Sequence, residues 1–154
     1  MATALARIPS GLFIVTWHDG DDDRGMLASW VMQAGFSPPA ITLAVATGRD
    51  LLAAIDGEGR FVVNILGESQ RPLLTRFGKP AAPGESPFAG LDVRRAEGGA
   101  PILAASAGWL ECRSLGRIGG DRTDHAVVLA EVLTAGAGET DAPLVHVRKN
   151  GLRY

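Results

Sequence analysis

Short apolar runs, rich in β-branched and aromatic residues, recur along the chain between polar and glycine-containing turns. Runs of this length and composition are typical of β-strands. The predicted strands are residues 12–17, 25–32, 40–46, 60–66, 108–115, 125–135 and 143–147. The hydrophobic pattern therefore predicts a mainly β protein.

Other segments predict what connects the strands. Residues 49–59 and 68–78 have helical spacing, with Pro72 acceptable only in the first turn of the second helix. The Asp-rich stretch 18–25 is predicted to be a solvated hairpin turn, because it lacks the alternating ligands and closing glutamate of a calcium loop. Residues 78–90, rich in proline and glycine, are expected to form a surface loop.

The strands have to protect their edges from other chains. A closed or nearly closed barrel is the usual solution for a small antiparallel protein. We therefore expect a barrel with a Greek-key connection and a few short helices, with a β-sandwich as the alternative. A chain of 154 residues with 46% hydrophobic content fits one domain, residues 1–154.

Charge and cysteine content narrow the possible partners and location. The net charge is −2 and the 15 Lys and Arg residues are scattered, which argues against a nucleic-acid partner. No apolar run approaches the roughly 20 residues that cross a bilayer. Cys112 is the single cysteine and can form no internal disulfide, and the first residues do not resemble a signal peptide. We expect a cytoplasmic protein without a membrane partner.

Common catalytic and metal-binding motifs are missing from the sequence. It contains no P-loop, no complete dinucleotide fingerprint and no nucleophile elbow. His18, His125 and His146 lie far apart and none has a closely spaced second ligand, so we predict no metal site. Cys112, within a predicted strand, is interpreted as a core or interface residue rather than a nucleophile.

The junction between the strand ending near residue 46 and the following helix is a candidate anion site. Thr47 offers a hydroxyl, and Arg49 is able to hold a phosphate through two parallel hydrogen bonds. The alternative is structural: Asp50 caps the helix, Arg49 is solvated and Gly48 permits a turn. The residues alone leave both interpretations open.

Residues 25–45, GMLASWVMQAGFSPPAITLAV, predict two apolar strands joined by a Phe-Ser-Pro-Pro turn. Small and polar residues stand in the middle of this expected core segment, where large side chains would pack better. They are Ser29, Gln33, Ala34 and Gly35. One interpretation is that they leave room for something else, and these residues alone leave open whether that is a ligand.

Several motifs occur in an order that resembles the flavin reductase-like, FMN-binding split-barrel family. They are RIPSGLFIVTW (7–17), the segment 25–45, RFVVNIL (60–66), GWLECR (108–113), DHAVVLAEV (124–132) and PLVHVRKNGLRY (143–154). The resemblance covers nearly the whole chain and is greatest for the flavin reductase modules of cyanobacterial flavodiiron proteins. It implies a split barrel.

The resemblance also implies the site residues. The flavin ring and ribityl chain would lie against Met26, Leu27, Ala28, Ser29 and Trp30, together with Gln33 and Ala34, and the phosphate against Ala46, Thr47 and Arg49. His125 would lie on the nicotinamide side of the flavin, or else only end a strand. Leu27, Trp30 and Gln33 differ from the Thr and Ser residues of many relatives, so the ribityl and phosphate contacts are expected to be rearranged. Tyr154 is a candidate to cover a partner's flavin, or else belongs to a frayed tail.

The implied activity is that of an NAD(P)H-dependent flavin reductase, which transfers hydride from NAD(P)H to FMN, with FAD as a possible substitute. The resemblance further implies a homodimer and an electron acceptor such as a monooxygenase. Two alternatives from other functional classes stay open: a flavin-carrying electron-transfer protein without a nicotinamide site, and a ligand-free interaction module.

Overall fold

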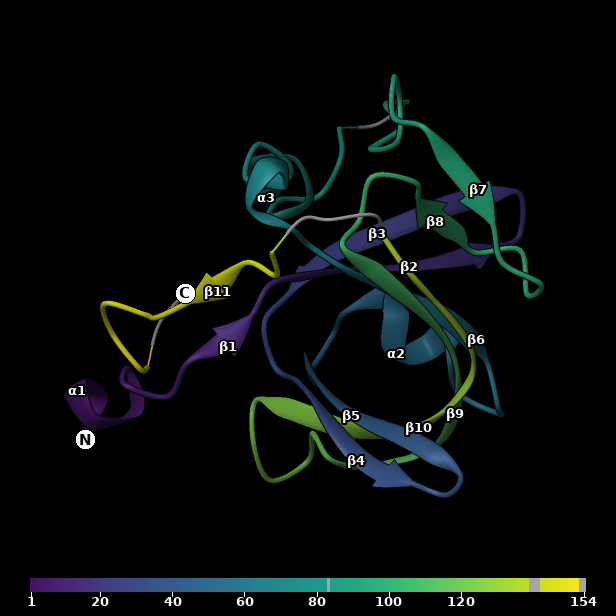
Figure 1. Ribbon diagram of the computed structural model, residues 1–154. Helices are drawn as coiled ribbons and strands as arrows, with labels where there is room; N and C mark the ends of the chain where they lie inside the picture. Colours follow the sequence, from purple (N-terminus) through teal and green to yellow (C-terminus); the bar gives the residue numbers. More distant parts are fainter. Residues whose placement is uncertain (83, 139–141, 153–154) are drawn as a thin grey trace.

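The computed structural model describes residues 1–82, 84–138 and 142–152. Strands dominate it and the helices are short (Figure 1). The strands are β1 (Ser10–Gly11), β2 (Phe13–Asp19), β3 (Asp22–Ala28), β4 (Val31–Phe36), β5 (Pro39–Ala46), β6 (Arg60–Ile65), β7 (Val93–Arg95), β8 (Pro101–Leu103), β9 (Gly108–Gly119), β10 (His125–Ala137) and β11 (Val145–His146). The helices are α1 (Ala2–Leu5), α2 (Asp50–Ala54), the 3-10 turn η1 (Glu68–Gln70) and α3 (Leu73–Phe77).

Seven of the described strands form one antiparallel sheet in the order β3-β2-β6-β9-β10-β5-β4. Strands β6, β9 and β10 are consecutive neighbours and β5 lies beside β10, which is the Greek-key arrangement. The sheet curls round α2 but does not close, because β3 and β4 are its two edges (Figure 1). This confirms the predicted split barrel.

Most predicted elements are present. The Asp-rich stretch contains the turn of the β2–β3 hairpin, at Gly20 and Asp21, and its other residues belong to the two strands. The stretch 49–59 contains α2. The predicted helix over 68–78 is divided into η1 and α3, because Pro72 stands immediately before α3. The predicted strand 143–147 is reduced to the two residues of β11, which pair with β1 beside the main sheet (Figure 1).

The predicted strand over 25–32 is wrong in one important respect. Its first half ends β3 and its second half begins β4, on the opposite edge of the sheet. Ser29 and Trp30 carry the chain across the opening between these edges. The expectation of a core segment is also wrong, because residues 32–34 lie exposed on the edge strand β4.

The barrel interior is filled by side chains from distant parts of the sequence. Val15, Phe61, Leu43 and Val128, from four different strands, are fully buried together with Leu51 of α2. Burying a side chain of this size stabilises the fold by about 1.5–3 kcal/mol. Because α2 contributes to this core, the chain between β5 and β6 is held against the barrel.

A buried polar network ties three strands together at the other side of β2. Asn64 Nδ2 donates to the Ile14 carbonyl at 3.1 Å and to Thr16 Oγ1 at 3.2 Å, and its Oδ1 accepts from the Leu103 amide at 2.7 Å. Thr16 in turn donates to the Pro101 carbonyl. Since buried polar groups are costly unless they are hydrogen-bonded, this network specifies how β8 lies against β2 and β6.

None of the helices in the described ranges is long and apolar enough to cross a membrane.

Candidate functional site

A cavity of about 610 Å³ lies where β3 ends and the chain crosses toward β4. Its walls come from β3, the crossing, β5, α3 and the segment 146–150. The lining residues are mostly apolar, and the polar ones include three cations, Arg49, Arg148 and Lys149, but no carboxylate from the described chain. Apolar walls with a few convergent polar groups are typical of small-molecule sites, and this charge favours an anionic ligand.

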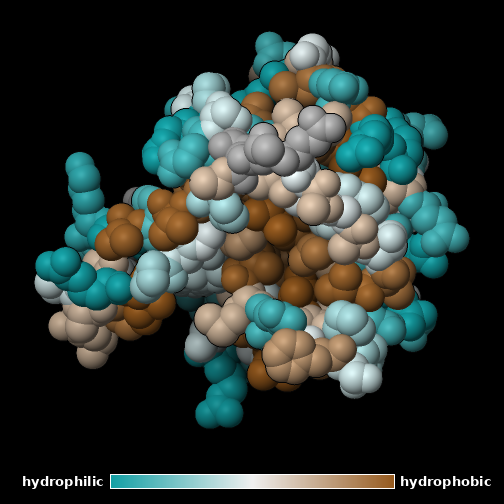
Figure 2. All heavy atoms as spheres, in the orientation of Figure 1, coloured by the Kyte–Doolittle hydropathy of each residue, from teal (hydrophilic) through white to brown (hydrophobic). Residues whose placement is uncertain are grey.

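The structure brings most of the predicted site residues to this cavity. The lining includes Met26, Leu27, Ala28, Ser29, Trp30, Ala46 and Arg49. The first three belong to β3, Ala46 ends β5, and Arg49 precedes α2. Figure 2 shows apolar surface gathered in the middle of this face, between the segment around β11 and the β4–β5 hairpin.

Three of the residues predicted to bind the flavin lie elsewhere. Gln33 and Ala34 are exposed on β4 and do not line the cavity. Thr47 is also outside its lining, with its amide and hydroxyl both donating to the Asp124 carbonyl, at 2.9 and 3.3 Å. Gly35 has a structural reason to be small: the register shifts here, and a Cβ would lie 3.2 Å from the Pro38 carbonyl oxygen.

The sequence did not predict that the segment 146–150 forms part of the cavity wall. Arg148 Nη2 donates to Ser29 Oγ at 2.8 Å, and its guanidinium carbon lies 4.4 Å from the centre of the Trp30 ring. His146 and Lys149 line the same cavity. The sequence signal here was a pair of basic residues after an apolar run, a pattern that is equally typical of a solvated surface and of a binding site.

His125 lies next to the cavity rather than in its wall. It pairs with Ala46 across β10 and β5, and its ring is 4.8 Å from that of Trp30 at an angle of 56°. Its Nδ1 lies 2.9 Å from Asp124 Oδ1. This hydrogen bond lowers the pKa of Asp124 below its usual range. Tyr154 lies outside the described residues.

Both interpretations of the β5–α2 junction need adjustment. Arg49 takes the cap position of α2 with an extended backbone, and Asp50 is the first helical residue rather than the cap. Gly48 has a φ of +82°, which favours glycine, so the expected turn is present. The Arg49 side chain is exposed, yet it reaches the cavity wall.

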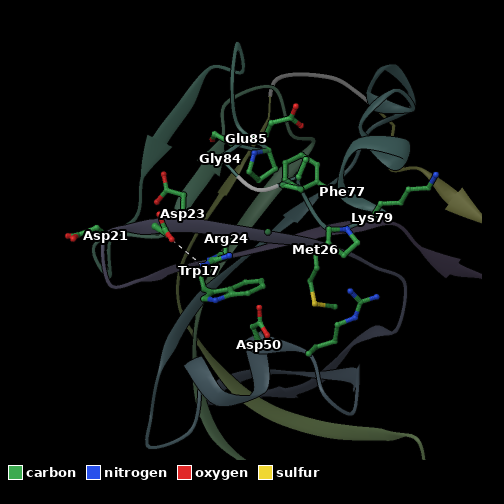
Figure 3. A pocket seen from close by; sticks show the side chains of 18 of the residues that line it. Trp17, Asp21, Asp23, Arg24, Met26, Asp50, Phe77, Lys79, Gly84 and Glu85 are labelled. Atoms are coloured by element: carbon green, nitrogen blue, oxygen red, sulfur yellow. Dashed lines mark hydrogen bonds and ion pairs between the residues drawn. The ribbon is translucent and has the colours of Figure 1, made fainter.

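A second cavity, of about 800 Å³, adjoins the first. Met26, Arg49 and Phe77 border both. Figure 3 shows Trp17, Met26 and Asp50 directed into the same space, with the loop around Gly84 and Glu85 on the far side. The two cavities therefore share part of their walls, at the end of β3 and beside α3.

Comparison with known protein families shows to which family a chain with these cavities belongs. The model of the flavin reductase like domain family matches residues 5–151. The chain belongs to this family. In this member of the family, the apolar cavity with its three cations is built from the segment 26–30, Arg49 and the segment 146–150.

Relatives and solved structures agree with this assignment. The chain is 39% identical over 153 residues to the putative diflavin flavoprotein A 3 of a Nostoc species, covering 98% of this chain and 26% of the relative. It thus spans about a quarter of the length of the curated relatives it matches. The NADH:FAD oxidoreductase SgcE6 of Streptomyces globisporus superposes with a TM-score of 0.83 at 26% identity, covering 97% of this chain and 87% of that one. The styrene monooxygenase flavin reductase of Pseudomonas putida S12 gives 0.79 at 25% identity, covering 98% and 92%.

Proposed function

We propose that this flavin reductase-like protein binds FMN in the cavity beside β3 and catalyses hydride transfer from NAD(P)H to the flavin. One observation carries the proposal: the family match coincides with a cavity whose apolar walls and three cations suit a flat, phosphate-bearing ligand. The flavin supplies the redox chemistry, and the protein supplies position and electrostatics.

The cavity walls divide the proposed work between them. Met26, Leu27 and Ala28 offer the apolar surface against which a flat ring would pack. Ser29 offers a hydroxyl to the polar edge of that ring. Arg49, immediately before α2, would hold the phosphate through its forked guanidinium, while Thr47 would join it only after releasing the Asp124 carbonyl.

FMN is the proposed flavin and FAD the substitute. The adjoining cavity offers space beyond Arg49 for the adenylate part of a dinucleotide, but it is lined by Asp21, Asp50 and Glu85 as well as by basic residues. Carboxylates next to a second phosphate would be unfavourable. This argues for the mononucleotide as the tighter ligand.

His125 is proposed to position the nicotinamide ring. It lies on β10 and pairs with Ala46 of β5, which lines the cavity, and its ring contacts the Trp30 ring. The related oxidoreductase SgcE6 has been solved with NAD and FAD fragments, which supports a nicotinamide site in this family. No side chain has to exchange a proton for hydride transfer, so His125 is assigned a binding role.

A homodimer is the proposed assembly. Exposed apolar side chains gather on the outer faces of β4, β10 and β9: Met32 is 70% exposed, Ile118 76% and Leu129 43%. Ala44, on the neighbouring strand, also lines the cavity. A second copy seated on this face would cover apolar surface that is otherwise unfavourable in water and would stand beside the flavin.

The electron acceptor is proposed to be a second protein, such as a monooxygenase or the remainder of a longer flavoprotein. The similar P. putida protein is the flavin reductase of a styrene monooxygenase, and the Nostoc relative is about four times as long as the matched region. We place the reaction in the reducing cytoplasm because Cys112 is the single cysteine and is buried as a free thiol.

The test is to mix the purified protein with FMN, remove free flavin, and titrate anaerobically with NADH and then NADPH. Bleaching of the retained flavin by one nucleotide supports the proposal and identifies the donor. Retained flavin that neither nucleotide bleaches favours the alternative, a flavin carrier reduced by another protein. Failure to retain FMN, with no nucleotide oxidation in excess FMN, would overturn both.

A further inference from the structure

We propose that Arg148 is a positioning residue for the flavin site: it orients the Ser29 hydroxyl as a hydrogen-bond donor to the ligand and thereby stabilises the reduced flavin. The inference rests on the proposed function. It assigns a role to the C-terminal segment, which enters the cavity from 119 positions away in the sequence.

The direction of the hydrogen bond carries the first step. A guanidinium only donates, so Ser29 Oγ is the acceptor in its 2.8 Å contact with Arg148 Nη2. The hydroxyl keeps one proton of its own. Within the described ranges Ser29 donates to no other group, so that proton is available to an acceptor in the cavity that Ser29 lines.

The second step is that Arg148 is held in place. Its guanidinium lies 4.4 Å from the centre of the Trp30 ring, a distance typical of a cation–π contact. The Trp30 ring also contacts His125, 4.8 Å away. Because the guanidinium is planar and always charged, this stacking fixes both its orientation and a positive charge beside Ser29.

The third step concerns what a polarised hydroxyl does. A hydroxyl that accepts from a cation is a stronger donor, because adjacent hydrogen bonds polarise one another. Donors aimed at a ring that gains negative charge stabilise the reduced form more than the oxidised form. We therefore expect Arg148 to raise the reduction potential of bound FMN and also to strengthen its binding.

The experiment is a double-mutant cycle with Arg148→Gln, Ser29→Ala and the double variant. Arg117→Gln is the matched control. Arg117 forms an ion pair with Asp56, with 3.0 Å between nitrogen and oxygen, and neither residue lines the cavity. Two quantities are measured: the Kd for FMN from flavin fluorescence, and the two-electron reduction potential of the bound flavin against a reference dye. Melting temperatures confirm folding.

Arg148→Gln is expected to raise the Kd for oxidised FMN about tenfold. The Kd for reduced FMN should rise by a further factor of about ten. The second factor corresponds to a potential lowered by about 30 mV. Ser29→Ala should give similar changes, and the double variant no more than either. The control should match the wild type.

Three outcomes would overturn the inference. An unchanged potential in Arg148→Gln would do so, and so would effects of the two substitutions that simply add. If the wild type does not bind FMN, the proposed function and this inference both fail. In the first two outcomes the wild type still binds FMN, so only this inference fails. If Arg148→Gln lowers the melting temperature, Arg148→Met, which removes the guanidinium but keeps an unbranched side chain, goes through the same cycle.

Discussion

Arg148 and Ser29 are 119 positions apart in the sequence, and the Arg148 guanidinium donates a 2.8 Å hydrogen bond to the Ser29 hydroxyl. Ser29 lies where the chain leaves one edge of the split sheet, and Arg148 lies in the segment that follows β11. The cavity wall is therefore completed only when the last part of the chain has folded onto the first hairpin.

Removing the Arg49 side chain should weaken the binding of FMN but not of riboflavin. A hydrogen bond to a charged partner is worth about 1.5–3 kcal/mol, so Arg49→Gln should raise the Kd for FMN about 10- to 100-fold. Riboflavin has no phosphate, and its Kd should stay within about twofold. Fluorescence titrations of both ligands test this, with Arg117→Gln as control. An equal loss for riboflavin would show that Arg49 shapes the cavity instead.

Changing His125 should affect the nicotinamide nucleotide rather than the flavin. His125→Asn is expected to lower kcat/KM for the preferred nucleotide by about tenfold or more, because misplacing a reacting ring is costly. The Kd for FMN should change by less than about threefold. His18→Asn is the matched control, since His18 pairs with Asp23 on the β2–β3 hairpin. An unchanged kcat/KM in His125→Asn would contradict the proposed role of His125 in positioning the nicotinamide ring.

Asp23 should make stability depend on pH in the acid range. Its partial burial alone would raise its pKa, but hydrogen bonds with Arg95 and His18 outweigh this and lower the pKa below its usual value. The folded state thus binds fewer protons than the unfolded state, and the stabilisation is present above about pH 4 and is lost as pH falls through the folded-state pKa.

At pH 7 we expect Asp23→Asn to lower the free energy of unfolding by about 1 kcal/mol, the scale of a partly exposed ion pair. The difference from wild type should shrink between about pH 4 and pH 2. Urea unfolding at several pH values measures both. Asp22→Asn is the control, because the Asp22–Arg24 pair is more exposed. A difference that grows toward low pH would contradict the assignment.

Cys112 should be inert in the folded protein. Burial, and secondarily the neighbouring Glu111, raise the pKa of its thiol to about 12. Only the thiolate reacts readily, so an aromatic disulfide reagent at pH 8 should release no chromophore from the native protein and one equivalent per chain in guanidinium chloride. Rapid stoichiometric reaction in the native state would contradict this, and Cys112→Ser supplies the baseline.

Local patterns predicted the strands well because their β-branched and aromatic residues form runs that are bounded by turn residues. Residues 125–135 and 60–66 became β10 and β6 for this reason, and the helix after Arg49 was equally visible. Ser29 and Arg49 were also singled out in advance, because a small polar residue in an apolar run and a strand-to-helix junction are local features, whereas Met26, Leu27, Ala28 and Trp30 came only from the family resemblance. The family resemblance then assigned them a ligand.

The crossing at Ser29 and Trp30 was invisible for a physical reason. Residues 25–32 are apolar almost throughout and contain no strand breaker after Gly25, so nothing local says that the chain moves from one edge of the sheet to the other. The exposure of Gln33 and Ala34 follows from that crossing. The places of Thr47, His125 and Arg148 follow from pairings made across the barrel.

The sequence by itself determined which segments are strands, that they build a split barrel of the flavin reductase-like family, and where most of the cavity wall begins. Only the tertiary structure decided that the wall is completed by the C-terminal segment and that β4 is an exposed edge. The reason is that hydrophobic patterning reports which side chains leave water, whereas contacts between distant segments depend on how the sheet curls and where it stays open.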